Sequence, residues 1–599
     1  MAFMNLNLSV DIYHPLVEHL SFDDTTSVTP LMWPLRCVVL HSGQFSDPIQ
    51  CDIVYSTLSD VRDHYEALSY TWGDMNDRSE ILVNGRPFPV TRNLEAALRD
   101  IRLGDTTRML WVDSICINQE DISEVNIQVQ RMWAIYEYAH QVLVFLGEAD
   151  RRSDSAFGLL SELSQLRGAS GADRITMLLN DQHKSASWDA LLCLLQRPWW
   201  GRAWIIQEYA VAKVVVFICG ANKMDGEVFG RALETLVEYR FSDSVPRAYE
   251  YLIRHVASTP IHHLWIARQR YQTSGPSTRP DAIGILYRFR GSQSFDPRDK
   301  VYSLHRLIAE NPKLKPDYAK KVHELYKDVV SAMIESSNTL EVLSHHNRSI
   351  EGLSDLPTWC PDWTVRRGKR ILLWPNQYRA AGDPSVPALF RVSGNILTLK
   401  GKIIDRIQWL KNFESDDFKN IQKIYEDVKY IENATIKYSK HNFENPDRVR
   451  DAFRRTLVAA RIRERGPNND PTILGLQEAD QLWDAWSRQR EGKPYNKTWA
   501  TWYNEALYSA LCGRAFIITQ QGFLGLVDGT AQTGDTIGVF VGGQVPFALH
   551  TNIDSPKSRA VEDMTGHVQY ELIGECYLHG FMSGEAFEPK PSLAEFDIV

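Results

Sequence analysis

Three apolar segments of this chain each end in a cluster of polar and aromatic residues. They are Tyr65–Asp74, Leu110–Gln119 and Arg202–Glu208. Short apolar runs of this kind are typical of buried strands or of the first turn of a buried helix. In an open α/β sheet, ligands bind beyond the carboxyl ends of the parallel strands. The pattern therefore predicts a parallel sheet that carries a functional site at one edge.

Strand and helix patterns alternate around these segments. Residues 110–115 and Gln141–Gly147 are apolar almost throughout, as strands inside a parallel sheet are. Between them, Glu124–Ala139 has apolar residues at helical spacing. Strand, helix and strand in this order predict an α/β domain.

Two hairpins are expected near the first segment. Arg36–His41 and Cys51–Tyr55 are rich in β-forming residues, and a polar loop joins them. Asn84 and Gly85 lie between apolar flanks, and both tolerate the positive φ angles of a tight hairpin turn. Either Thr91 or Asn93 is suited to cap the helix that follows.

A chain of 599 residues is too long for one hydrophobic core. We predict four parts. They are a β-hairpin extension at 1–60, an α/β domain at 61–225 with a helical insertion at 150–197, a helical region at 226–375, and a β-rich C-terminal domain at 376–599 with a helical insertion at 412–508. Phe390–Leu410 is expected to be a strand of the last domain.

Composition narrows the class of protein. The net charge of −9 argues against a nucleic-acid partner, because phosphate binding requires a concentrated basic surface. No apolar run is long enough to span a membrane, and Met1–Pro15 lacks the basic and then apolar pattern of a secretory signal. The eight cysteines include no Cys-x-x-Cys pair, which favours reduced thiols over a metal site. We therefore expect a cytoplasmic protein without a bound metal.

The three segments together resemble the HET (heterokaryon incompatibility) domain of fungi. Further segments resemble the companion region of many members of that family: Pro297–Tyr302, Lys315–Tyr318, Trp359–Trp363, Gly525–Asp535 and Gly574–Gly580. The resemblance implies a part in self/non-self recognition and in cell-death signalling. It also implies an incompatibility partner protein, which the sequence does not identify.

The first domain also resembles TIR domains more distantly. Ala67–Asp74 is similar to their first strand and loop, Leu110–Asp113 to their second strand, and Trp204 to Glu208 keeps the spacing of their helix motif. This likeness implies a flavodoxin-like parallel sheet and cleavage of NAD between nicotinamide and ribose, with Glu208 as the essential carboxylate. The insertion at 150–197 departs from the TIR pattern.

The implied reaction has simple chemical requirements. Its transition state resembles a ribosyl oxocarbenium ion, which a carboxylate such as Glu208 stabilises. Nicotinamide leaves as a neutral molecule, so no strong general acid is needed. NAD would be a substrate and not a cofactor, and the activity would be gated by self-association. Residues expected near the ligand are Ser69, Tyr70, Trp72, Gly73, Asp113, Asn118 and Trp204.

Each of these residues also has a structural interpretation. Glu208 fits an exposed helix position that pairs with Arg202 or Lys213. Asp113 fits a cap of the turn that follows it. Ser69 and Gly73 fit a structural turn, Asn118 fits a loop brace, and the tryptophans fit the core. Glu124 and Gln128 lie one helical turn apart. They fit either a pair that faces the loop at Asn118 and Gln119 or a solvated helix face.

The alternative function is a non-enzymatic interaction module. An enzyme predicts a concave pocket in which Glu208, Asp113 and the first loop converge with aromatic rings. An adaptor predicts Glu208 on a solvated face with no pocket.

Overall fold

The computed structural model divides the chain into two compact units, residues 1–322 and 323–599. The helical region predicted at 226–375 contributes helices to both. The residues that the structure describes are 12–16, 32–166, 169–239, 252, 260–274, 282–308, 314–346, 353, 355–365, 378–383, 385–439, 446–463, 471–473, 476–551, 568–588 and 592–599.

The first unit is built on a nine-stranded mixed sheet with the strand order β5-β4-β2-β1-β6-β3-β7-β8-β9. Its strands are β1 (Pro34–Leu40), β2 (Gln50–Thr57), β3 (Glu66–Ser69), β4 (Arg78–Val83), β5 (Arg86–Thr91), β6 (Arg108–Trp111), β7 (Gln141–Phe145), β8 (Val215–Cys219) and β9 (Asn222–Asp225). The mixed α/β class with a parallel-containing sheet is thereby confirmed.

The four central strands, β6, β3, β7 and β8, run parallel to one another. In chain order they are arranged 2-1-3-4, so the direction of the strand order reverses at β3. Antiparallel pairs flank them, with β1 beside β6 on one side and β9 beside β8 on the other. The predicted strand at 110–115 is shorter than expected. It ends at Trp111, and Asp113–Cys116 forms the short helix α3.

Both predicted hairpins are present, and both extend the same sheet. β1 and β2 pair antiparallel from Pro34 opposite Thr57 to Leu40 opposite Cys51. β4 and β5 pair around Asn84 and Gly85, whose φ angles are 51° and 71°. Positive φ at both positions is what a two-residue hairpin turn requires.

Helices cover the sheet and extend beyond it. Those of the first unit are α1 (Leu58–Val61), α2 (Arg92–Ile101), α3 (Asp113–Cys116), α4 (Ile122–Tyr138), α5 (Ser153–Ser164), α6 (Ala169–Asn180), α7 (Ser185–Leu195), α8 (Ile205–Ala210), α9 (Gly226–Tyr239), α11 (Pro260–Ser274), α12 (Ala282–Phe289), α13 (Asp299–Tyr302) and α14 (His305–Ile308). The Thr91 side chain caps α2 by accepting a hydrogen bond from the Leu94 amide at 3.3 Å.

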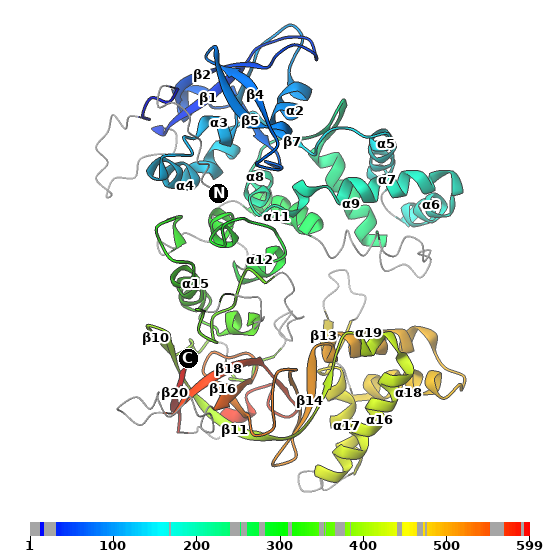
Figure 1. Ribbon diagram of the computed structural model, residues 1–599. Helices are drawn as coiled ribbons and strands as arrows, with labels where there is room; N and C mark the ends of the chain where they lie inside the picture. The colour runs from blue at the N-terminus through cyan, green and yellow to red at the C-terminus, as the bar shows by residue number, and fades with distance from the viewer. Residues whose placement is uncertain are drawn as a thin grey trace. The chain divides into compact units, whose positions relative to one another are not determined.

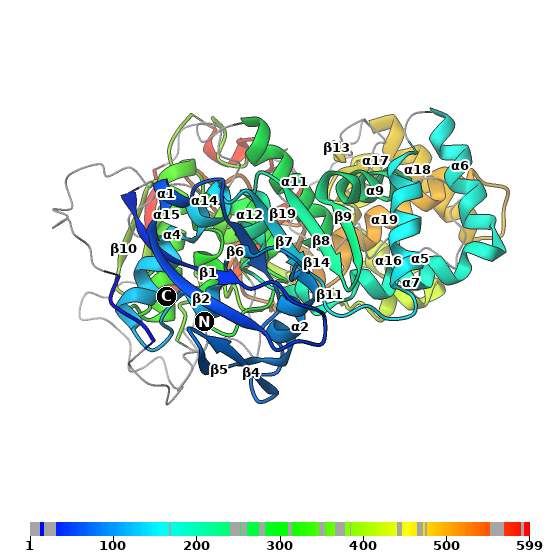
Figure 2. The ribbon, with the colours of Figure 1, turned by 90° about the horizontal axis from the view of Figure 1, so that it is seen from above.

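The predicted helical insertion is formed by α5, α6 and α7. α5 packs against α7 and α9. Figures 1 and 2 show the strands β1, β2, β4 and β5 on one side of the first unit and α5 to α7 on the other. A further predicted helix, at 248–256, falls almost entirely outside the described residues.

The second unit contains a ring of five strands. β11 (Ile396–Phe413) pairs with β16 (Thr536–Phe540), β16 with β17 (Phe547–Thr551), β17 with β18 (Gln569–Glu575), β18 with β20 (Ala594–Ile598), and β20 with β11 again. The other strands are β10 (Phe390–Ser393), β12 (Arg461–Arg463), β13 (Pro471–Ile473), β14 (Arg514–Thr519), β15 (Leu524–Asp528) and β19 (Tyr577–Leu578). The β-rich C-terminal prediction is confirmed, and the closure of the ring is an addition to it.

One predicted strand of this unit is divided in two, and the predicted helical insertion contains four helices. The strand expected at Phe390–Leu410 is split by a turn at Gly394, whose φ is 60°, into β10 and β11. The helical insertion consists of α16 (Ile421–Tyr438), α17 (Pro446–Leu457), α18 (Leu476–Arg490) and α19 (Lys497–Leu511), and α15 (Val322–Ser337) precedes the ring.

Replacing Gly401 with Ala is expected to destabilise the second unit by about 1–3 kcal/mol, as overpacking does. A Cβ at Gly401 would lie 2.5 Å from the Val539 carbonyl oxygen and 2.4 Å from the Phe540 ring. Gly538 is the matched control, because a Cβ there meets its nearest neighbour at an ordinary 3.4 Å. Urea unfolding should show the loss for Gly401→Ala and little change for Gly538→Ala. Equal effects of the two would contradict the closure of β11 on β16.

No helix among the described residues is both long and apolar enough to cross a membrane. All eight cysteines carry free thiols.

Candidate functional site

β3 ends at Ser69, at the point where the strand order reverses. Ser69 lies opposite Val144 of β7 and is buried. In open α/β sheets, the crevice at such a reversal is the usual ligand site. The side chains around Ser69 therefore define the candidate site.

Glu208 reaches Ser69 from α8. Its Oε2 accepts a hydrogen bond from Ser69 Oγ and lies 3.8 Å from Arg202 Nη1. All six residues of α8 are buried, and Glu208 is 2% exposed. The interpretation of Glu208 as an exposed helix position is therefore wrong, because α8 packs against α4 and α11 and has no solvated face. Lys213 pairs instead with Asp63, at 2.5 Å.

The two oxygens of Glu208 have different surroundings. Oε2 is shared by Ser69 and Arg202, whereas Oε1 accepts no hydrogen bond from the described part of the chain. Oε1 therefore keeps its capacity to accept a hydrogen bond, although Glu208 is buried in this structure. Burial raises the pKa of Glu208, while Arg202 and the Ser69 hydroxyl act against the rise and Asp113 adds to it.

Asp113 lies near this group but has both oxygens occupied. Oδ1 accepts from the Ser114 amide at 2.7 Å, and Oδ2 accepts from Trp72 Nε1 at 2.9 Å. Burial raises the pKa of Asp113, and Arg202 and Trp72 lower it. A carboxylate with both oxygens bonded to the protein positions its neighbours more readily than it binds a ligand.

Tyr70 and Trp72 are held on the first loop by polar contacts. Tyr70 donates its hydroxyl proton to Ser114 Oγ at 2.7 Å, and its carbonyl oxygen accepts from Arg202 Nη1. Trp72 is half-buried and donates to Asp113. These contacts tie the first loop to the start of α3 and to Arg202, so the predicted residues Ser69, Tyr70, Trp72, Asp113 and Glu208 are brought together.

Gly73 and Trp204 have simpler surroundings. Gly73 has a φ of 79°, a conformation that favours glycine, and a Cβ there would lie 3.2 Å from the Asn93 Cβ. Trp204 is 7% exposed, and its Nε1 is enclosed without a hydrogen-bond partner among the described residues. Gly73 therefore allows the backbone conformation of the turn. Trp204 is buried in the core, and its Nε1–H donates no hydrogen bond to the described residues.

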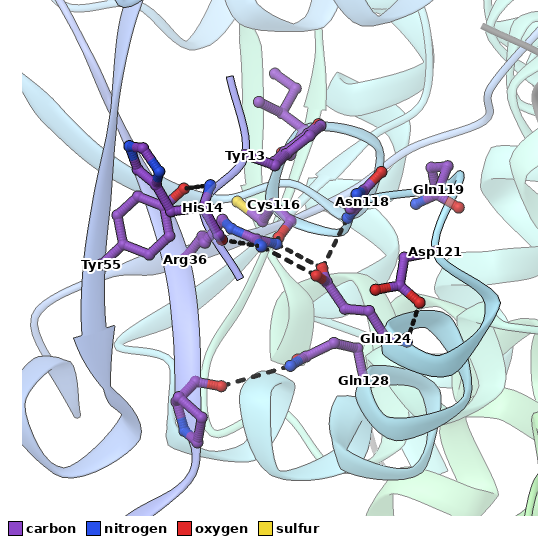
Figure 3. A network of polar contacts seen from close by, with 12 residues as sticks. Tyr13, His14, Arg36, Tyr55, Cys116, Asn118, Gln119, Asp121, Glu124 and Gln128 are labelled. Carbon is purple, nitrogen blue, oxygen red and sulfur yellow. Dashed lines mark hydrogen bonds and ion pairs between the residues drawn. The ribbon is translucent and has the colours of Figure 1, made fainter. Parts of the chain in front are cut away.

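Asn118 belongs to a second network, drawn in Figure 3. Its backbone amide donates to Glu124 Oε1 at 2.8 Å, and its Oδ1 accepts from the Glu120 amide at 3.2 Å. Gln119 Nε2 donates to the Asp113 carbonyl oxygen at 3.0 Å. These contacts brace the loop after α3.

The centre of the second network is a buried ion pair between Arg36 of β1 and Glu124 of α4. Arg36 Nη1 and Nη2 contact the two carboxylate oxygens at 2.5 and 3.0 Å, and the side chains are 0% and 9% exposed. The solvated-face interpretation of Glu124 is therefore wrong. Arg36 also lies 4.9 Å from the ring centre of Tyr13 and 5.4 Å from that of Tyr55 (Figure 3).

The helix α3 joins the two networks. Its last residues accept hydrogen bonds from the second network, at the Ile115 carbonyl from Tyr13 and at the Cys116 carbonyl from Arg36. Its first residues, Asp113 and Ser114, bond to Trp72 and Tyr70. The position of the first loop thus depends on contacts at both ends of one short helix.

Replacing Glu208 with Gln is expected to change how the melting temperature of the protein depends on pH. The folded chain raises the pKa of this carboxyl by burial, so its stabilising contribution is present below the unfolded-state pKa and is lost as pH rises through the folded-state pKa. The melting temperature of the variant minus that of the wild type should therefore increase as pH rises above about 4, the ordinary pKa of a glutamate side chain. Glu120→Gln, at an exposed glutamate, controls for the loss of one charge. A difference that stays flat or falls would contradict the raised pKa.

Neither Arg36 nor the hydrogen bond that Trp199 makes was identified from the sequence. Trp199 Nε1 donates to Ser69 Oγ at 2.9 Å. Arg36 lies in the apolar strand β1. No feature of the neighbouring sequence indicates that its partner is on α4. Arg202 was considered as a partner of Glu208, and it is the cation nearest to that carboxylate.

Comparisons with known proteins agree with the earlier resemblance. A family model described as heterokaryon incompatibility protein (HET) matches residues 65–208, which run from the residue before β3 to Glu208. A model described as Het-6 beta-barrel domain matches residues 488–593, which include β14 to β18 but not β11. Heterokaryon incompatibility protein 6, OR allele, from Neurospora crassa is 24% identical, and the alignment covers 94% of this chain and 95% of that protein. No solved structure matches the chain.

Proposed function

We propose that this chain, which belongs to the HET family of fungal proteins, signals cell death in self/non-self recognition by hydrolysing NAD in its N-terminal unit. The relative from Neurospora crassa carries heterokaryon incompatibility in its name and aligns along nearly the whole chain. The chemical step is proposed from the residues of the site.

The strand order supports a TIR-like interpretation of the first unit. The parallel strands follow the order 2-1-3-4 of flavodoxin-like sheets, and the reversal lies at β3, beside Ser69. Glu208 lies directly at that point, bonded to Ser69.

One observation carries the catalytic proposal. Glu208 is a buried carboxylate with one oxygen held by Ser69 and Arg202, and the other accepts no hydrogen bond from the residues that the structure describes. In the proposed reaction, Oε1 binds the ribose and faces the positive charge that develops at the anomeric carbon. The carbon–nitrogen bond breaks, and nicotinamide leaves with the electron pair. Water then attacks the anomeric carbon and releases a proton, which yields ADP-ribose.

Access to this site requires a change of conformation, because Glu208 is 2% exposed. We include self-association as the event that opens the site, since a lethal NAD-consuming activity has to be off in the monomer. In this movement the loop that begins at Tyr70 would have to release its hydrogen bonds to Arg202 and Ser114.

A second candidate function is a non-enzymatic interaction module. The solvated Glu208 that this function predicted is not found, but the module stays a candidate because Glu208 is only 2% exposed to a ligand in this structure. In that account Ser69, Arg202 and Glu208 only hold α8 against the sheet. Partner proteins would then bind the loops or sheet edges of the unit, and NAD would be irrelevant.

Product analysis separates the two functions. The purified full chain, at concentrations that span its self-association, is incubated with NAD, and nicotinamide and ADP-ribose are quantified by chromatography. The enzyme account predicts equal amounts of both products from the wild type and almost none from Glu208→Gln. No product from the wild type in any association state would favour the interaction module.

A further inference from the structure

We infer that Trp199 and Ser69 form a hydrogen-bond relay that favours the ionised form of Glu208 and assigns Oε1 to the ligand. This inference rests on the proposed function for its catalytic meaning, but the relay itself is testable without catalysis. Ser69 links the two partners, since its Oγ bonds to Trp199 Nε1 at 2.9 Å and to Glu208 Oε2.

The direction of the relay follows from the chemistry of the donors. An indole nitrogen donates a hydrogen bond and does not accept one, so Ser69 Oγ accepts from Trp199. A serine hydroxyl has one proton to donate, and the only remaining partner of Ser69 Oγ among the described residues is Glu208 Oε2. Ser69 is therefore held as a donor toward the carboxylate. A donor in this position stabilises the ionised form of the acid over the neutral form.

Trp199 is fixed by its own packing. Its ring meets Trp200 at 4.8 Å with an interplanar angle of 83°, and it meets Phe217 of β8 at 5.9 Å and 90°. Both are edge-on arrangements, which aromatic pairs favour. The indole is buried and cannot turn away from Ser69 without disturbing these rings.

The relay acts against a strong opposing effect, the burial of Glu208. The charged and titratable groups around Glu208 come from four elements or loops. Arg202 precedes α8, Asp113 begins α3, Tyr136 lies on α4, and Arg268 of α11 bonds to carbonyl oxygens at the end of α8. Of these, Arg202 is the cation that directly faces the carboxylate, at 3.8 Å. At that distance it does not replace a hydrogen-bond donor.

The two oxygens of Glu208 are made unequal by this arrangement. Ser69 and Arg202 both approach Oε2, so Oε1 is the atom that can accept a hydrogen bond from a ligand hydroxyl. Ser69 and Trp199 are thus positioning residues: they act through Glu208 and need not touch the substrate.

Titration of the Glu208 carboxyl tests the relay directly. The full chain is labelled with glutamate carrying carbon-13 at the side-chain carboxyl, and Glu208→Gln identifies the resonance. Ser69→Ala is expected to raise the proton affinity of Glu208 about tenfold, because the hydroxyl donor is lost. Ser69→Thr should restore it, and Trp199→Phe, which keeps the hydroxyl but frees its orientation, should give a smaller rise. Ser114→Ala is the matched control, since its hydroxyl bonds to Tyr70 and not to Glu208.

The outcomes separate the relay from the proposed function. A proton affinity that is unchanged in Ser69→Ala overturns the relay, even if NAD cleavage depends on Glu208. A shift in Ser69→Ala that Ser69→Thr reverses supports the relay, even if the wild type releases no nicotinamide. If the wild type does cleave NAD, the acid limb of the pH profile of kcat/KM should move to higher pH in Ser69→Ala. An equal shift in Ser114→Ala would assign the effect to general loosening of the site and would overturn the relay.

Discussion

Replacing Arg36 with Ala is expected to lower the free energy of unfolding of the N-terminal unit by about 3–5 kcal/mol, the usual effect of removing one member of a buried ion pair. Arg36 is fully buried and satisfies four acceptors. They are both oxygens of Glu124 and the carbonyl oxygens of His14 and Cys116. Its loss leaves the Glu124 carboxylate buried without a cation, and the desolvation of that charge is then uncompensated.

A double variant separates the pair from the surrounding packing. Arg36→Met combined with Glu124→Met removes both charges and keeps comparable volume, so most of the stability is expected to return. Amide hydrogen exchange in peptides from 108–145, measured on the full chain, reports the local free energy of opening. A loss under about 1 kcal/mol for Arg36→Ala, the range of exposed pairs, would contradict the buried-pair account.

Replacing Glu208 with Gln is expected to lower kcat/KM for NAD by about 100- to 1000-fold, as the loss of one preorganised electrostatic group does. Gln keeps the size of the side chain and can still accept from Ser69. It lacks the negative charge that faces the developing ribosyl cation, so the loss should fall mainly on kcat. Glu120→Gln, at an exposed position on the loop after α3, should retain wild-type kinetics. A Glu208→Gln variant with more than about half of the wild-type kcat/KM would remove Glu208 from the chemistry.

Many strands and turns of the first unit could be predicted, because each is specified by a short stretch of sequence. The run at Gln141–Phe145 is apolar on both faces, and β7 is a central parallel strand. Asn84 and Gly85 specify their turn through backbone conformation alone. The assembly of both hairpins into one sheet with the parallel strands was not predictable in this way. It depends on pairings such as Val38 with Leu110, between residues far apart in the sequence.

The closure of the five-stranded ring in the second unit was even harder to predict from the sequence. β11 pairs with β16 and β20, and the helical insertion from α16 to α19 lies between these strands in the chain. Strand pattern predicts each strand, but it does not predict which strand closes the ring. Gly401, where β16 approaches too closely for a side chain, is the local trace of that closure.

At the candidate site, sequence reasoning predicted which segments would meet but not how each charge is held. The expected proximity of Ser69 and Asp113 follows from strand ends that share one sheet edge. That of Glu208, which lies on α8, was implied by the resemblance to TIR domains. Asn118 as a ligand contact stays a prediction. Its backbone amide bonds to Glu124, a pairing that was not foreseen from the sequence. Burial of a carboxylate and the identity of its partners depend on tertiary packing, and periodicity alone does not distinguish a buried Glu208 from a solvated one.

The most direct test of the central claim is the level of NAD in fungal or bacterial cells that express the wild type or Glu208→Ala at matched abundance. The account predicts that NAD falls with the wild type, that it stays at the control level with Glu208→Ala, and that cell death follows the loss of NAD. Cell death with unchanged NAD in both cases would contradict it, and the unit would then act through protein contacts alone.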